Sequence, residues 1–139
     1  MASARCARLA ALLGPLLVTA CGPSDEATER AAVAEKIDAL RNIPAEDTSS
    51  RVRAVDALRR VPARTAEGVA ARDACASAFA ALAEGMRLTE RAQTGLAPGS
   101  TALAEDTLRA ASSANALLDQ ADALLDRCAD ASAALRVTR

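Results

Sequence analysis

Apolar residues recur at helical spacing along four stretches of the chain, and each stretch predicts one helix. Valine, isoleucine and leucine side chains repeat every three or four residues, which is the period of one face of an α-helix. The four stretches are residues 25–42, 50–61, 63–94 and 101–137. Pro44, Pro62 and the turn sequence Gly95-Leu96-Ala97-Pro98-Gly99 separate them, because proline and glycine interrupt helices.

The last predicted helix has the most regular pattern. Its apolar and small residues alternate four and three positions apart, as the core positions of a coiled coil do. They are Leu103, Thr107, Ala110, Ala114, Leu117, Ala121, Leu124, Cys128, Ala131 and Leu135. Leu108, Leu118 and Leu125 widen this stripe, and we expect them to face the core as well. The two preceding helices carry shorter stripes, Val52, Val55, Leu58 and Val61 in one and Cys75, Phe79, Leu82 and Met86 in the other.

The composition agrees with these periods. Alanine, which has the highest helix propensity, is the commonest residue, and Phe79 is the only aromatic one. The fold class predicted is therefore all-α: a small antiparallel helical bundle of three or four helices with a long C-terminal helix. Alanine contacts bury little area, so we expect a thin core.

Residues 1–20 have the layout of a secretory signal. Arg5 and Arg8 precede a short apolar run that contains Gly14 and Pro15 and is too short to span a bilayer. The run ends in Val18-Thr19-Ala20-Cys21, which resembles the lipobox of bacterial lipoproteins. The domain organisation expected is a cleaved signal peptide at 1–20, a lipidated tether at 21–24 and a helical domain at 25–139.

The resemblance to bacterial lipoproteins implies a role for Cys21. In that family the cysteine thiol receives a diacylglyceryl group and cleavage, here between Ala20 and Cys21, frees its amine. Acyl chains of this kind anchor a protein stably. Gly22, rather than aspartate, follows the cysteine, which favours the periplasmic face of the outer membrane. The alternative is an ordinary secretory signal with a coincidental cysteine.

With Cys6 in the signal and Cys21 carrying lipid, Cys75 and Cys128 remain. Two cysteines in an exported protein most often form a disulfide, although two separate buried thiols are the alternative. A zinc site is disfavoured because the chain lacks histidine, so we expect no metal. The pairing requires a staggered hairpin, because the distances of the two cysteines from the predicted turn differ by about 12 Å along the helices.

Four aspartates, Asp119, Asp122, Asp126 and Asp130, follow one another at helical spacing in the last helix. They form either a docking face for a basic partner or cation, or a solvated flank. A third interpretation pairs them with arginines of another helix, such as Arg53, Arg60 and Arg64. Charge stripes usually mark solvated faces, which favours the flank.

Several function classes fit the sequence poorly. The chain has no histidine, no glycine-rich phosphate loop and no nucleophile motif, so we expect neither an enzyme nor a cofactor. The 17 basic and 18 acidic residues and the scarcity of aromatic residues also disfavour nucleic acid as a partner.

The function expected is that of a membrane-anchored, non-enzymatic envelope lipoprotein that binds another envelope protein or serves as a structural accessory module. The alternative is a periplasmic bundle that binds a small molecule between its helices. The heptad positions also permit self-association, although alanine at half of them makes a weak coiled coil.

Overall fold

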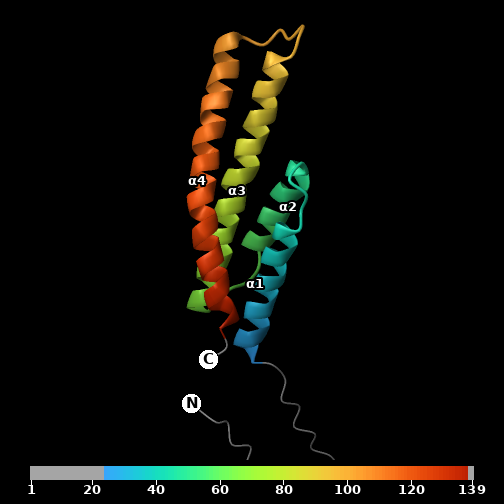
Figure 1. Cartoon of the computed structure of the whole chain (residues 1–139). Helices are drawn as coiled ribbons and strands as arrows, with labels where there is room; N and C mark the ends of the chain where they lie inside the picture. The colour runs from blue at the N-terminus through green and yellow to red at the C-terminus, as the bar shows by residue number, and fades with distance from the viewer. Residues whose placement is uncertain (1–23, 138–139) are drawn as a thin grey trace, which may run out of the picture.

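The computed structural model describes residues 24–137, which form four helices. These are α1 (Asp25–Arg41), α2 (Thr48–Arg59), α3 (Ala66–Leu96) and α4 (Ala104–Arg136). Successive helices run in opposite directions, so the start of α1 and the end of α4 lie at the same end of the molecule (Figure 1). The predicted all-α antiparallel bundle with a long C-terminal helix is confirmed.

Local hydrogen bonds determine where the first three helices begin. The side chains of Ser24, Asp47 and Thr65 accept hydrogen bonds from the N–H groups of Ala27, Ser50 and Gly68, respectively. Each bond satisfies a donor that the first turn of a helix leaves unpaired. Because Asp47 is the cap, α2 begins two residues earlier than its apolar pattern predicted.

The helices differ in length, and this determines the shape of the molecule. The long helices α3 and α4 form a hairpin, and α4 measures about 50 Å from its 33 residues. The shorter α1 and α2 pack beside the lower part of this hairpin only, and its upper part extends beyond them (Figure 1). Arg136 at the end of α4 is paired at 2.6 Å with Asp38 in the last turn of α1, which joins the two helices.

The core therefore has two compositions. Beside α1 and α2 it contains large aliphatic side chains, with Ile37, Leu40 and Leu58 fully buried around Phe79. Outside this cluster the buried residues of α3 and α4 are small, and five of them are alanines: Ala83, Ala92, Ala110, Ala114 and Ala121. Small side chains let two helices approach closely, so the upper hairpin depends on close backbone packing rather than on bulky side chains.

Cys75 and Cys128 form a disulfide across the hairpin, with their Cα atoms 4.5 Å apart. This confirms the predicted pair and excludes two separate thiols. The predicted stagger of about 12 Å is too large. Leu96, the end of α3, lies 21 residues after Cys75, and Ala104, the start of α4, lies 24 residues before Cys128. The difference of three residues is about 4.5 Å, which the connecting loop, residues 97–103, spans.

Three predicted core residues are exposed instead. Val52, Leu103 and Leu108 have exposed fractions of 49%, 69% and 68%. Val52 lines an open hollow between α2 and α3. Leu103 precedes α4, whose Thr107 faces Gly95 near the end of α3, so no helix remains opposite it. Leu108 follows the buried Thr107 by one position, which is about 100° around the helix, so it points away from the contact between α3 and α4.

Candidate interaction surfaces

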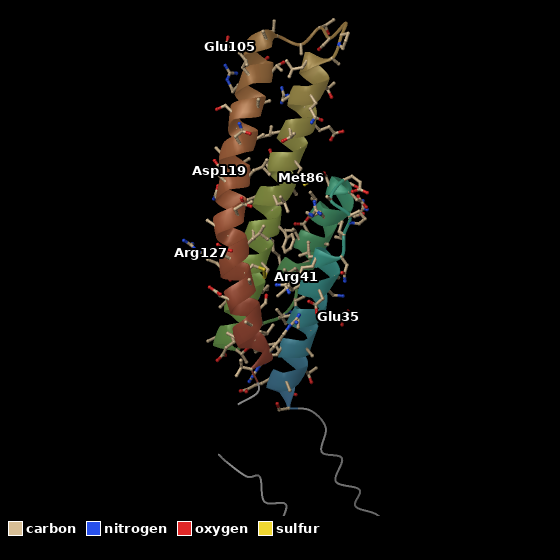
Figure 2. All side chains as sticks on the ribbon, in the orientation of Figure 1. Glu35, Arg41, Met86, Glu105, Asp119 and Arg127 are labelled. Atoms are coloured by element: carbon tan, nitrogen blue, oxygen red, sulfur yellow. A yellow bond between two sulfur atoms is a disulfide. The ribbon has the colours of Figure 1, made fainter. Side chains whose placement is uncertain are left out.

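Asp119, Asp122, Asp126 and Asp130 lie on one face of α4, which we call the acidic face. All four are exposed. Figure 2 shows Asp119 projecting away from α3. Within residues 24–137, none of the four takes part in an ion pair.

The interpretation that pairs the acidic face with Arg53 and Arg60 is wrong, and the favoured solvated flank is confirmed. α2, which carries Arg53 and is followed directly by Arg60, packs against α1 and α3 but not against α4. Arg53 instead donates to Ser50 Oγ at 2.9 Å, and Arg60 Nε donates to the carbonyl oxygen of Asp56 at 3.0 Å. The acidic face is therefore a solvated surface of negative charge.

A second surface lies at the upper end of the hairpin, where Leu96, Leu103 and Leu108 form what we call the leucine tip. Their exposed fractions are 74%, 69% and 68%. Leu96 ends α3, Leu103 precedes α4 and Leu108 lies in its second turn. Sequence reasoning assigned Leu103 and Leu108 to the core and overlooked the tip. The absence of charge was a sequence signal that could have indicated the tip. Residues 92–104 form the longest run without a charged residue between positions 24 and 137.

Leu103 also occupies an unusual position for a leucine. Leu103 occupies the N-cap position of α4, immediately before the first residue of the helix. Its side chain makes no capping hydrogen bond. The other three helices have a serine, an aspartate or a threonine there. Leucine is among the least favourable residues at this position, so an exposed Leu103 does not stabilise the fold.

Arg51 is the one buried charged side chain among the described residues, with an exposed fraction of 4%. Its guanidinium donates to the carbonyl oxygens of Ile43, Pro44 and Ala45 at 3.1 to 3.2 Å and to Met86 Sδ at 3.2 Å. Figure 2 shows Met86 on α3 at the height of the α1–α2 loop. These bonds hold the α1–α2 loop against α3. Arg51 was not singled out in the sequence, because an arginine in a helix usually points to solvent.

The carboxylates with shifted pKa values are held by hydrogen bonds. Glu29 of α1 accepts from the Thr65 hydroxyl at 2.6 Å and from its N–H at 2.9 Å, and these bonds lower the pKa of Glu29. Bonds from Ser50 lower the pKa of Asp47, and the bond from Arg87 lowers that of Glu84. A lowered pKa makes a carboxylate a weaker base, so these three groups are poor candidates for general bases.

The hollows on the described surface are shallow. One, between α2 and α3, has a volume of about 110 Å³ and is lined by Val52, Val55, Ala80 and Ala83 under a charged rim. Another, of about 580 Å³, lies open to solvent beside the start of α1. The small-molecule hypothesis expected an enclosed cavity with converging polar groups, and neither hollow provides one. Residues 24–137 also contain no group of three potential ligands arranged around a metal position.

The residues assigned to lipidation and cleavage, Ala20 and Cys21, lie outside the described part of the chain. The first described residue is Ser24, which caps α1 at the lower end of the bundle. Among residues 24–137, no helix combines the length and apolarity needed to cross a bilayer.

Comparisons with models of protein families, with curated proteins and with solved structures found no match for this chain.

Proposed function

We propose that the protein is a non-enzymatic lipoprotein of the bacterial cell envelope, anchored through Cys21. The observation that carries this proposal is the sequence Val18-Thr19-Ala20-Cys21 at the end of a basic and then apolar N-terminal segment. Cleavage after Ala20 leaves Cys21 as the first residue, with a diacylglyceryl group on its sulfur. The acyl chains then hold the protein on the membrane.

The position of α1 indicates how the bundle would be presented. Ser24 caps α1 three residues after Cys21, so the anchor lies next to the end of the bundle where α1 begins and α4 ends. The hairpin loop lies at the opposite end (Figure 1), about 50 Å away along α4. A rigid hairpin of this length suits an accessory module that contacts another envelope protein at a distance from its own anchor.

The anchor is tested by feeding cells radiolabelled palmitate and by mass spectrometry of the N-terminal peptide. We expect the label on the full-length protein and an acylated Cys21 at the mature N-terminus. Cys21→Ala should abolish both labelling and cleavage at this position, whereas the matched variant Cys6→Ala should retain them. A mature protein that begins with an unmodified Cys21, or one cleaved elsewhere, would disprove the lipoprotein assignment.

Localisation is tested separately by membrane fractionation. The proposal places the unaltered protein in the outer membrane, because Gly22 follows the lipidated cysteine. Gly22→Asp should move it to the inner membrane. A Gly22→Ala variant, which keeps a small uncharged residue, should stay with the unaltered protein.

The protein partner is tested by photo-cross-linking in intact cells. A cross-linkable residue is placed at Asp122 on the acidic face and, in a matched control, at the exposed Arg53 on α2. We expect one envelope protein to be trapped from Asp122 and not from Arg53. Replacing Asp119, Asp126 and Asp130 with asparagine should reduce this product. Recovery of the monomer alone from several positions on each of the four helices would count against an accessory role.

A further inference from the structure

Met86 is the one side chain between residues 24 and 137 that a mild oxidant attacks readily. The chain contains no tryptophan, tyrosine or histidine, and Met1 is its only other methionine. Cys75 and Cys128 are already oxidised to a disulfide. Sulfur-containing side chains are the usual targets of peroxides in proteins. A peroxide that reaches the described part of the chain is therefore directed to a single atom, Met86 Sδ.

Met86 lies at the edge of the folded core. It is half-buried, whereas the preceding residue, Gly85, is buried and the following residue, Arg87, is exposed. Figure 2 shows Met86 on α3 at the height of the α1–α2 loop. Because part of the Met86 side chain remains exposed, a molecule as small as hydrogen peroxide can reach it without unfolding of the chain.

A buried cation holds the same sulfur atom. Nη1 of Arg51 donates to Met86 Sδ at 3.2 Å and to the carbonyl oxygen of Ala45 at 3.1 Å. Nη2 of Arg51 donates to the carbonyl oxygens of Ile43 and Pro44. The exposed fraction of Arg51 is 4%. These bonds fix the guanidinium group and keep one of its N–H groups against one side of the sulfur.

This contact divides the two sides of the sulfur atom. A thioether sulfur carries two lone pairs, one on each side of the plane that contains the sulfur and its two bonded carbon atoms. Oxygen added to one lone pair gives one sulfoxide epimer, and oxygen added to the other gives the opposite configuration at sulfur. The N–H of Arg51 occupies one lone pair, so an oxidant finds only the other one free.

From these observations we propose that Met86 is a site of reversible oxidation and that Arg51 determines which sulfoxide epimer forms. The free lone pair of Sδ attacks one oxygen atom of hydrogen peroxide, so that an S–O bond forms and the O–O bond breaks. The proton of the transferred oxygen passes to the departing hydroxide, which leaves as water. The sulfur loses two electrons and the peroxide gains them.

The selection of one epimer determines how the modification is reversed. Methionine sulfoxide reductases remove the oxygen, and each of their two classes accepts one epimer. Repair of Met86 therefore depends on one class alone. The oxygen is added on the side away from Arg51, so the hydrogen bonds from Arg51 to the α1–α2 loop are retained and the oxidised protein stays folded.

The test oxidises the isolated full-length protein with hydrogen peroxide, once in native buffer and once in concentrated urea. After reduction of the disulfide, trypsin releases residues 73–87, which contain Met86. The two classes of reductase, applied separately to this peptide, give the amount of each epimer by mass spectrometry. In native buffer one epimer should exceed the other by roughly fivefold or more, as expected from the free energy of one hydrogen bond. In urea the two amounts should be nearly equal.

Equal amounts of the two epimers in native buffer would overturn the proposal, and so would a native protein in which Met86 is not oxidised. The readout is confined to residues 73–87, so neither Met1 nor Cys21 affects it. The lipid anchor therefore stands or falls by its own test.

Two variants test the role of Arg51. Arg51→Ala removes the donor, and Arg51→Leu removes it while filling the space of the buried stem. Each is oxidised in native buffer under conditions in which its unfolding curve shows it to be folded, and each should give nearly equal amounts of the two epimers. The matched control Arg53→Ala, at an exposed residue of the same helix, should keep the native ratio. A folded Arg51 variant that also keeps the native ratio would show that the guanidinium does not select the epimer, which overturns the proposal.

Discussion

Leu118 of α4 packs directly over the backbone of Gly85 in α3. A Cβ atom at Gly85 would lie 2.9 Å from Leu118 Cδ2 and 3.0 Å from its Cγ. Both distances are shorter than carbon atoms in contact normally allow. The absence of a side chain at Gly85 therefore lets α3 and α4 approach each other next to Met86, the residue of α3 that Arg51 of α2 contacts.

Gly85→Ala should consequently have effects of opposite sign in two backgrounds. In the unaltered chain the added methyl group displaces Leu118, and we expect a net destabilisation of about 1 kcal/mol. In a Leu118→Ala background the space is free, and the same change should stabilise the protein by about 0.5–1 kcal/mol, because alanine favours helix. Urea unfolding of the four proteins measures both effects. Equal changes in the two backgrounds would show that the close contact is absent.

Loss of the disulfide should greatly destabilise the bundle. Cys75 and Cys128 are 53 residues apart in sequence, and closing a loop of this length restricts the unfolded chain by about 4 kcal/mol in the chain-entropy model. The double variant Cys75→Ala/Cys128→Ala should lose up to this amount in chemical denaturation, and reduction of the unaltered protein should have a similar effect. The double variant itself should not respond to reductant. Reaction of either thiol in the unreduced native protein would contradict the bridge.

Arg51→Ala should destabilise the protein by about 3 kcal/mol. The change removes hydrogen bonds from a buried cation to three carbonyl groups of the α1–α2 loop and leaves those acceptors without partners. Arg53→Ala is the matched control on the same helix, because Arg53 is exposed and its side chain contacts only Ser50 Oγ. The control should change stability by less than about 0.5 kcal/mol. Comparable losses in the two variants would disprove a special role for Arg51.

The contact between Glu29 and Thr65 predicts a pH dependence. The Thr65 hydrogen bonds lower the pKa of Glu29 below 4.5, so the folded state binds its proton less readily than the unfolded state. This contribution to stability is fully present above pH 4.5 and is lost as the pH falls through the lowered pKa. Glu29→Gln should reduce the difference in unfolding free energy between pH 7 and pH 3. The control Glu35→Gln, at a residue bonded only to neighbouring Lys36, should retain that difference.

The sequence was sufficient to predict the helices, which follow from local periodicity, and the disulfide, which follows from the two cysteines that remain in a chain expected to be exported. Residues such as Cys128 and Leu135 are buried as their spacing indicated. Leu103 is exposed because burial there depends on how far α3 extends. Leu118 and Leu125, seven residues apart, share one side of α4 and are partly buried, whereas Leu108 lies one position after Thr107 and therefore on another side of the helix.

The candidate surfaces were predicted less completely for the same reason. The acidic face was predictable, since aspartates at helical spacing share one side of α4 whatever surrounds it. The leucine tip was not, because an apolar residue in a helical pattern gives no sign that its neighbour has ended. Arg51 depends on a loop that folds back over it, a tertiary relationship that no local pattern contains.

The position of the disulfide has a consequence for the integrity of the protein in a compartment that contains proteases. Cys75 and Cys128 enclose the whole upper hairpin in a covalent ring, and its exposed loop, residues 97–103, lies inside that ring. Loops of this kind are preferred sites of cleavage. A cut there opens the ring but releases no fragment, so a nicked molecule keeps both halves joined until its disulfide is reduced.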